Sequence, residues 1–260
     1  MEPEEKALPP IEIENTIVSE EEAPPIGVIK KEPEDMWIPR TKLGVKVMNK
    51  EITNIDHILS SGIRILEAHI VDRLLPNLDS DFALIGQSKG KFGGGKRSIW
   101  RQTQRKTKEG NKPKFSTLVI VGDKNGHVGI GLGKAKETVP AREKAMRAAK
   151  TSIITIRRGC GSWACSCSTP HSIPFKVYGR CGSVKVELMP APKGTGLATE
   201  KETRKLLGLA GVKDIHSKTY GQTRTKINLM YAYFDALKRL TKTKVKHQYY
   251  KQSGLTEGSI

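Results

Sequence analysis

The sequence predicts an α+β fold with two consecutive domains. Short β-branched segments lie between residues 99 and 135, and a helical pattern of apolar and basic residues follows from Pro140. The same change from strands to helices recurs after residue 173. An apolar fraction of 37% in 260 residues fits two small domains better than one large domain.

Residues 1–35 form a strongly acidic segment. They contain eleven Asp and Glu against three Lys, which gives a net charge of 3 − 11 = −8. The other 225 residues carry 42 − 16 = +26, so the whole chain reaches +18. Because acids and prolines dominate the segment, we predict a disordered or extended tail.

Residues 36–80 predict a helical lead-in. Apolar residues from Ile52 to Leu75 recur at spacings of three and four, with an interruption near Gly62 and a stop at Pro76. We expect this lead-in to dock on the domain that follows.

Residues 81–158 predict a first domain with the order β-β-β-α. A strand around residues 99–106 precedes a second strand at 115–121, and Asn125-Gly126 suits a hairpin turn into the third. Pro140 suits the first turn of the following helix, whose alanines line one face.

The second domain is predicted at residues 173–245, after a cysteine loop at 159–172. Residues 246–260 are assigned to a C-terminal tail. The expected elements of the second domain are strands at 175–178 and 184–189 and helices at 200–210 and 223–238.

The charge of +18 and a pI near 9.8 indicate a polyanionic partner. Lys and Arg are spread along the chain, which favours nucleic acid over a membrane surface. No apolar run approaches the roughly 20 residues of a membrane helix, and the acidic start lacks the layout of a secretory signal. We therefore expect a cytoplasmic protein without a membrane partner.

The segment GKFGGGKR, residues 90–97, matches most of a nucleotide phosphate loop. Such a loop ends in Ser or Thr, whose hydroxyl binds magnesium, whereas this chain has Arg97 at that position. A flexible basic loop explains the segment better than an NTPase site. We find no paired carboxylates and no nucleophile motif, so neither enzyme activity nor a small-molecule substrate is expected.

Residues 89–114 form a very basic stretch that contains a single acid, Glu109. Such density on a glycine-rich loop and a hairpin predicts contact with RNA, which is recognised largely through phosphates and 2′-hydroxyl groups. A solvated loop without a ligand is the alternative. The predicted contacts in this stretch are Lys89, Lys91, Lys96, Arg97, Arg101, Arg105, Lys106, Lys112 and Lys114.

All four cysteines lie between residues 160 and 181, with the spacing Cys160-x4-Cys165-x-Cys167-x3-His171. Three thiolates with an imidazole, or four thiolates, are ligand sets of structural zinc sites. The spacing departs from the usual C-x2-C pair, so reduced thiols without metal are the alternative. If one zinc ion binds, Cys160, Cys165 and Cys167 are the first ligands, and His171 or Cys181 is the fourth.

Three long segments resemble one protein family. They are FSTLVIVGDKNGHVGIGLGKAKETVPAREKAMRAAKTSI at 115–153, PHSIPFKVYGRCGSVKVELMPAPKGTGL at 170–197 and LAGVKDIHSKTYGQTRT at 209–225. Over about residues 40–245 the chain is similar to the small-subunit ribosomal protein five family. The RRGCGSW segment resembles the archaeal and eukaryotic-type branch of that family rather than the bacterial one, and the cysteine trio resembles the archaeal members.

The resemblance implies a first domain of the double-stranded-RNA-binding β-β-β-α type and a second α/β domain with a left-handed βαβ crossover. It also implies a place in the small ribosomal subunit, near the decoding region and the channel through which mRNA enters. The implied partners are 16S-type ribosomal RNA, mRNA, and the small-subunit proteins three, four and eight.

The same resemblance adds candidate site residues. Lys134, Lys136 and Arg142 match basic positions of the family, and Arg157 and Arg158 of the RRGCGSW segment are also predicted RNA contacts. Tyr178, Arg180 and Lys185 match the face that lies against protein four, where changes in the family alter accuracy. We expect a structural constituent of the small subunit that supports translational accuracy. The alternative is a double-stranded-RNA-binding regulator that acts off the ribosome.

Overall fold

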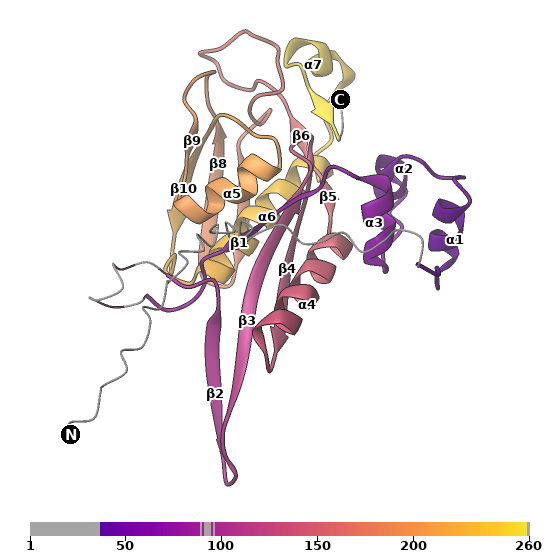
Figure 1. Cartoon of the computed structure of the whole chain (residues 1–260). Coiled ribbons are helices and arrows are strands. Elements are labelled where there is room, and N and C mark those ends of the chain that lie inside the picture. Colours follow the sequence, from indigo (N-terminus) through magenta and orange to yellow (C-terminus); the bar gives the residue numbers. More distant parts are fainter. Residues whose placement is uncertain (1–36, 89, 91–94, 96, 259–260) are drawn as a thin grey trace, which may run out of the picture. The chain divides into compact units, whose positions relative to one another are not determined.

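Residues 37–88, 90, 95 and 97–258 are described by a computed structural model, in which helices pack on two larger sheets (Figure 1). The predicted acidic segment 1–35 and three predicted RNA contacts, Lys89, Lys91 and Lys96, lie outside the described residues. Within the described part, no helix has the length and apolar character needed to cross a membrane. The α+β class predicted from the sequence is confirmed.

Along the described residues, three helices precede the first strand, and later helices separate runs of strands. The helices are α1 (Lys42–Met48), α2 (Ile55–Ser60), α3 (Ala68–Leu74), α4 (Thr138–Thr151), α5 (Lys201–Leu209), α6 (Lys226–Lys242) and α7 (His247–Gln252). The strands are β1 (Asp79–Ala83), β2 (Arg101–Thr107), β3 (Gly110–Gly122), β4 (His127–Ala135), β5 (Ile154–Thr155), β6 (Arg157–Arg158), β7 (Val177–Cys181), β8 (Val184–Pro190), β9 (Leu197–Ala198), β10 (Ile215–Tyr220) and β11 (Thr256–Glu257).

The central strand of the first sheet is β3. On one side it pairs with β4, and β5 continues the sheet beyond β4. On the other side β2 pairs with the first half of β3, and β1 pairs with the second half. The predicted strands and helix are present as β2, β3, β4 and α4, and β1 is an addition to the predicted order.

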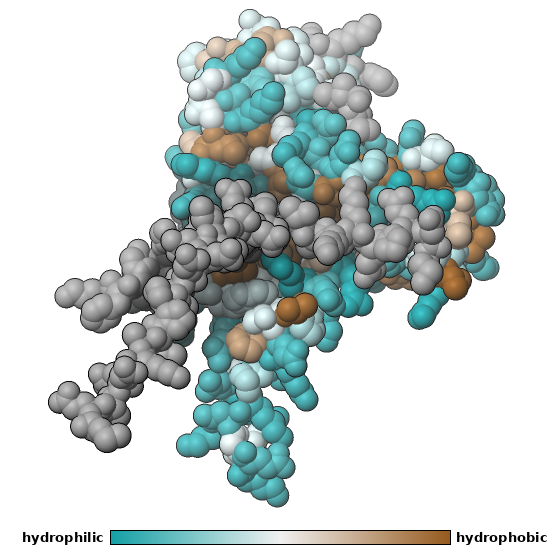
Figure 2. Space-filling view, viewed as in Figure 1, coloured by the Kyte–Doolittle hydropathy of each residue, from teal (hydrophilic) through white to brown (hydrophobic). Residues whose placement is uncertain are grey.

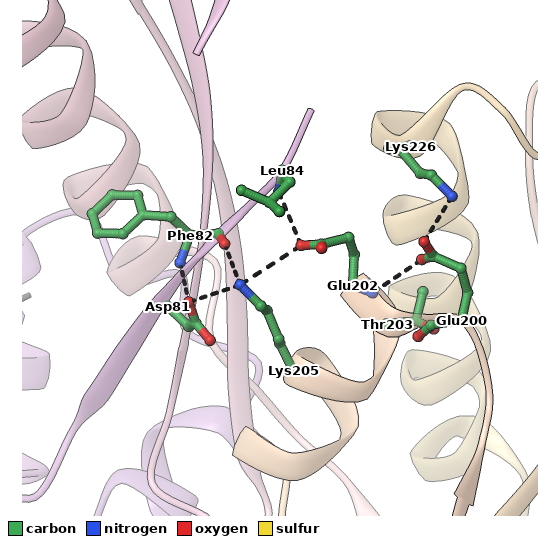
Figure 3. A network of polar contacts seen from close by, with 8 residues as sticks. All are labelled: Asp81, Phe82, Leu84, Glu200, Glu202, Thr203, Lys205 and Lys226. Atoms are coloured by element: carbon green, nitrogen blue, oxygen red, sulfur yellow. Dashed lines mark hydrogen bonds and ion pairs between the residues drawn. The ribbon is translucent and has the colours of Figure 1, made fainter. Parts of the chain in front are cut away.

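β1 is held to α5 by polar contacts (Figure 3). Its sequence, DSDFA, has one large apolar side chain, so it shows no strand-like alternation. The buried carboxylate of Glu202 accepts a hydrogen bond from the backbone N–H of Leu84 at 2.9 Å. Lys205 donates to the carbonyl of Phe82 at 2.8 Å and to Asp81 at 3.2 Å. These contacts join the first sheet to the second half of the chain.

Three alternate glycines of β4 allow α4 to pack very close to the first sheet. A Cβ added at any of them would lie 2.1–2.2 Å from a carbonyl oxygen of α4. The pairs are Gly129 with Ala149, Gly131 with Ala145, and Gly133 with Ala141. The alternating glycines of GIGLGK therefore serve helix packing.

The lead-in is helical, as predicted, and consists of α1, α2 and α3. Its apolar cluster, which includes Ile58 and Ile70, extends to Ile153 just after α4. Lys150 of α4 also donates to Asp72 of α3 at 2.7 Å. Through these contacts the lead-in packs against α4 and the residue that follows it.

The second sheet has the strand order β7-β8-β10-β9, and α6 packs against β7 and β8. β9 and β10 are parallel neighbours, and α5 lies between them in the sequence. One apolar cluster joins Leu118 and Ile120 of the first sheet to Leu188 and Leu237 of the second half. The two sheets therefore share a core.

The described part of the predicted C-terminal tail forms α7 and β11. β11 pairs antiparallel with β6, with Thr256 opposite Arg158 and Glu257 opposite Arg157. The backbone N–H of Cys160 donates to the carbonyl of Ser253 at 2.8 Å. Residues 246–258 therefore pack against the start of the cysteine loop.

Candidate nucleic-acid interface and cysteine cluster

The hairpin of β2 and β3 is exposed over its outer half. Residues 101–106 of β2 and residues 110–114 of β3 are exposed, whereas β3 is buried from Ser116 onward. In Figure 2 the projecting part of this hairpin is hydrophilic. Core packing therefore does not explain the choice of side chains in the outer half.

The strand register gathers most basic side chains of the hairpin on one face. Arg105 lies directly opposite Lys112. Because side chains alternate between the two faces of a strand, Arg101, Arg105, Lys112 and Lys114 share one face. Lys106 belongs to the other face.

The hairpin carries an excess of positive charge. Like charges on directly opposite residues destabilise an isolated hairpin, so the pairing of Arg105 with Lys112 brings no advantage within the chain. Among the described residues the hairpin has one ion pair, between Lys112 and Glu109 at 2.6 Å. Residues 101–116 hold six basic residues and one acid, a net charge of 6 − 1 = +5. This geometry fits a ligand with closely spaced negative charges, such as an RNA backbone.

Three other predicted RNA contacts lie near the base of the hairpin. Lys134 is exposed and lies in one row with Ser116 and Arg101 across three strands. Lys136 is exposed directly after β4, and the half-buried Arg97 pairs with Ser88 in a β-bridge. Lys134 therefore extends the basic face of the hairpin onto the sheet.

Arg142 of α4 packs against an aromatic ring. The central carbon of its guanidinium lies 4.6 Å from the centre of the Phe82 ring, a cation–π geometry. Its Nε is buried, and no hydrogen-bond partner for this atom is found among the described residues. In this structure Arg142 helps to pack α4 against β1.

Arg157 and Arg158 are buried, unlike the basic residues of the hairpin. Arg157 donates to the carboxylate of Glu257 and to the carbonyl of Thr243. Arg158 donates to the carbonyl of Asn125 at 2.9 Å. Because both guanidinium groups have partners inside the protein, we correct the predicted RNA surface and leave these two residues out of it.

The predicted protein-interface residues Tyr178, Arg180 and Lys185 lie together on the second sheet. Arg180 is opposite Lys185 in the pairing of β7 with β8. With Tyr220 these residues line a shallow hollow of about 310 Å³, and 54% of Tyr178 is exposed. Exposed Tyr and Arg side chains are enriched in contact surfaces between proteins.

Three cysteines and one histidine of the cysteine loop meet at one point. The sulfur atoms of Cys160, Cys165 and Cys167 and a ring nitrogen of His171 lie within 4.8 Å of one another. All four cysteines of the chain are free thiols. Cys181, the other predicted fourth ligand, lies at the end of β7 and is not part of this group. The structure therefore favours His171 over Cys181 as the fourth member.

The thiols of the cluster differ in acidity. Burial raises the pKa of Cys160 to about 11. Hydrogen bonds with the hydroxyl and the backbone of Thr169 lower the pKa of Cys167 to about 6, and the two side-chain atoms lie 3.0 Å apart. Cys167 is therefore the thiol that is most readily present as a thiolate, which is the form that binds metals.

Asp214 supports His171 and lies beyond the sequence predictions. Its Oδ2 lies 2.8 Å from Nδ1 of His171, although the two residues are 43 positions apart in the sequence. Its Oδ1 accepts the backbone N–H groups of Gly194 at 3.1 Å and Gly196 at 2.8 Å. A single Asp before a strand carries no local signal of such a role.

Known proteins match both halves of the chain. Residues 99–157 match the N-terminal domain of ribosomal protein S5, and residues 179–249 match its C-terminal domain. A small ribosomal subunit protein uS5 of Nanoarchaeum equitans is 50% identical over 224 residues, which are 86% of this chain and 96% of that protein. The chain belongs to the ribosomal protein S5 family.

The uS5 protein of Methanocaldococcus jannaschii is 44% identical over 226 residues, which are 87% of this chain and 97% of that protein. These similarities confirm the predicted family and its archaeal branch. Membership of the S5 family makes this chain a structural ribosomal protein and not an enzyme. The cysteine cluster lies between the two segments that match the S5 domains.

Proposed function

We propose that the chain is a cytoplasmic constituent of the small ribosomal subunit that binds 16S-type ribosomal RNA. Its place is near the decoding region and the channel through which mRNA enters, where it supports translational accuracy. Its relatives are named small ribosomal subunit protein uS5, which supports a place in the small ribosomal subunit. The single observation that carries RNA binding is the basic face of the β2–β3 hairpin, where Arg105 lies opposite Lys112.

The proposed mechanism is electrostatic. Basic side chains of the hairpin replace the counterions of RNA phosphates, and the released counterions drive binding. Lys134 continues the basic face onto β4, so the surface reaches from the exposed hairpin to the sheet. Phosphate contacts fix position and orientation rather than base sequence, which fits a structural role.

The proposal includes the finer features of the fold. β2, β3, β4 and α4 correspond to a double-stranded-RNA-binding β-β-β-α arrangement, supported by a helix that packs on an antiparallel sheet. We propose that β9-α5-β10 has the left-handed crossover that the family resemblance implies; the adjacent parallel strands support a crossover between them but do not set its hand. The domains follow the predicted borders, with 81–158 and 173–245 on either side of the cysteine loop.

The exposed face of Tyr178, Arg180 and Lys185 is proposed as the contact with small-subunit protein four. Its support is the hollow that these side chains line together with Tyr220. Proteins three and eight are the other proposed neighbours, and mRNA is the second nucleic-acid partner. RNA binding by the hairpin does not depend on these contacts.

Replacing Arg101, Arg105, Lys112 and Lys114 by Ala tests the basic face of the hairpin. Binding of the full chain to a small-subunit ribosomal RNA transcript is measured over a range of salt concentrations. Each lost phosphate contact is expected to reduce the log–log salt slope by about 0.7–0.9, so the loss of four contacts reduces it by roughly 3. A control variant with Ala at the exposed residues Lys201, Lys238, Lys242 and Lys244 removes the same charge elsewhere.

The proposal requires a larger loss of slope in the hairpin variant than in the control variant. Equal slopes in the two variants would show that net charge, and not this face, determines binding. Sedimentation of cell lysate separates the ribosomal role from an RNA regulator that acts off the ribosome. A chain found only outside the small-subunit peak would favour the regulator.

A further inference from the structure

The cysteine cluster lies apart from the surfaces used in the proposed function. Its members come from residues 160–171, and the side chains of Cys160 and His171 are buried. The segments that match the S5 domains end at residue 157 and resume at residue 179. Neither RNA binding by the hairpin nor the general S5 fold therefore explains why three thiols and an imidazole converge here.

His171 is oriented so that its second ring nitrogen faces the thiols. Its Nδ1 lies 2.8 Å from Oδ2 of Asp214, and both side chains are buried. An ionised carboxylate only accepts hydrogen bonds, so Nδ1 is the donor to Asp214 and Nε2 is the nitrogen left to face the thiols. Nε2 lies 3.9 Å from the sulfur of Cys165. A carboxylate bound to the outer nitrogen is the regular companion of a metal-binding histidine.

Asp214 is itself fixed in place. Its second carboxylate oxygen accepts two backbone N–H groups, from Gly194 and Gly196. The backbone N–H groups of Lys213 and Asp214 donate to the carbonyl of His171 at 2.9 and 3.1 Å. Packing alone would account for the burial of His171. It would not account for a ring nitrogen held within 4.8 Å of three sulfur atoms.

We propose that Cys160, Cys165, Cys167 and His171 bind one zinc ion through three sulfur atoms and one nitrogen. Zinc takes four such ligands in tetrahedral geometry. Because the protein supplies all four ligands, no coordination position is open to water or substrate, and the ion is structural. In the free-thiol alternative, Nε2 of the buried imidazole faces thiols, which are weak hydrogen-bonding groups.

The ion fastens segments that are distant in the sequence. Cys160 is bonded through its backbone to Ser253 of the C-terminal segment, at 2.8 Å. His171 is bonded through Asp214 to the turn that contains Gly194 and Gly196. The zinc site therefore joins the cysteine loop, the turn after β8 and the C-terminal segment, independently of RNA.

The test uses the full chain purified without chelators. Zinc content is measured by plasma mass spectrometry, and the metal-free chain is titrated with Co²⁺, whose tetrahedral thiolate complexes absorb visible light. We expect roughly one zinc ion per chain in the wild type and in the control variant Cys181→Ser. We expect zinc to be lost from Cys165→Ser and from Cys167→Ser.

Two further variants separate loss of metal from loss of folding. Asp214→Asn keeps all four ligands and is expected to bind zinc about 10–100-fold more weakly in competition with a chromophoric chelator. His171→Cys restores a complete ligand set and is expected to retain zinc. The proposal is overturned if the wild type takes up neither zinc nor Co²⁺, if iron accompanies the chain instead, or if Cys181→Ser loses the metal. Salt-dependent RNA binding is a separate measurement, so either proposal can fail alone.

Discussion

At the scale of single residues, His127 is a buried connection between the lead-in and the first sheet. Its ring nitrogens lie 2.6 Å from Asp123 and 2.8 Å from Asp56 of α2. Burial alone lowers the pKa of His127, but the two carboxylates outweigh burial and raise it above the usual 6.5. Burial alone raises the pKa of Asp123, but His127 outweighs it and the net pKa is lowered. The folded state therefore favours a charged His127 and a charged Asp123.

We expect the contribution of His127 to the free energy of unfolding to decline as the pH rises above about 6.5. Because the folded-state pKa of His127 is raised, its contribution is complete below about pH 6.5 and is lost as the pH rises through the raised pKa. Asp123 has a lowered pKa, so its contribution is present above about pH 3.8 and is lost as the pH falls through the lowered pKa. Arg158, which also acts on Asp123, keeps its charge over this range.

Denaturant unfolding between about pH 5 and pH 9 measures this dependence. His127→Gln is expected to flatten the decline on the alkaline side, because Gln does not titrate. His57→Gln changes an exposed histidine of α2 and should keep the wild-type profile. An identical decline in His127→Gln would mean that another group is responsible.

Candidate site residues were predictable where their partners are close in the sequence. The hairpin face follows from the alternation along two consecutive strands, and the cysteine cluster comes from one short loop. Arg157 and Arg158 were also predicted to contact RNA, which requires exposed side chains. Their partners, among them Glu257, come from segments far along the chain, and only the tertiary structure shows that they are buried. Asp214 was not predicted, because its partner His171 is also distant in the sequence.

At the scale of elements, the contact of α4 with β4 depends on glycine. A Cβ at Gly131 would lie 2.2 Å from both the carbonyl oxygen of Ala145 and the backbone nitrogen of Ala149. We expect Gly131→Ala to destabilise the protein by about 1–3 kcal/mol or more, because α4 must move away from the sheet. Thermal unfolding measures this change.

Gly208→Ala is the matched control for that substitution. Gly208 lies within α5, and a Cβ there would meet nothing within 4 Å. Alanine at this helical position is expected to stabilise the protein by up to about 1 kcal/mol. A Gly131→Ala variant as stable as Gly208→Ala would show that α4 has more room than the structure indicates.

Elements with their own periodic pattern were predictable, and elements fixed by distant partners were not. The apolar residues of the lead-in and the alanines of α4 recur at helical spacing within one helix at a time, so the local sequence is enough to indicate these helices. β1 is a strand because β3 and α5 provide its partners. β11 is a two-residue strand that exists through its pairing with β6, so nothing in its own sequence indicates it.

At the scale of the whole molecule, the net charge of +18 opposes folding of the free chain through self-repulsion. Salt screens this repulsion, and the Debye length falls from about 30 Å at 0.01 M to about 10 Å at 0.1 M. We expect Tm to rise by about 2–4 °C over this range, which corresponds to ~1 kcal/mol for a protein of this size. Calorimetry in the two buffers measures the shift.

The hairpin variant with four alanines provides the comparison for this salt effect. It carries four fewer positive charges, so its Tm should rise less than that of the wild type. A decrease of Tm with salt in the wild type would instead mean that screening of attractive ion pairs, such as the one between Lys150 and Asp72, outweighs the relief of repulsion.

The pairing of β6 with β11 has a consequence for folding during synthesis, because the two strands lie far apart in the sequence. Arg157 and its partner Glu257 are 100 residues apart. At translation rates of about 5–20 residues per second, the arginines emerge roughly 5–20 s before the segment that covers them. During that interval β6 lacks its partner strand, and the guanidinium groups of Arg157 and Arg158, which are buried in the folded protein, are exposed to water. The pairing of β6 with β11 therefore forms only after the C-terminal segment has been synthesised.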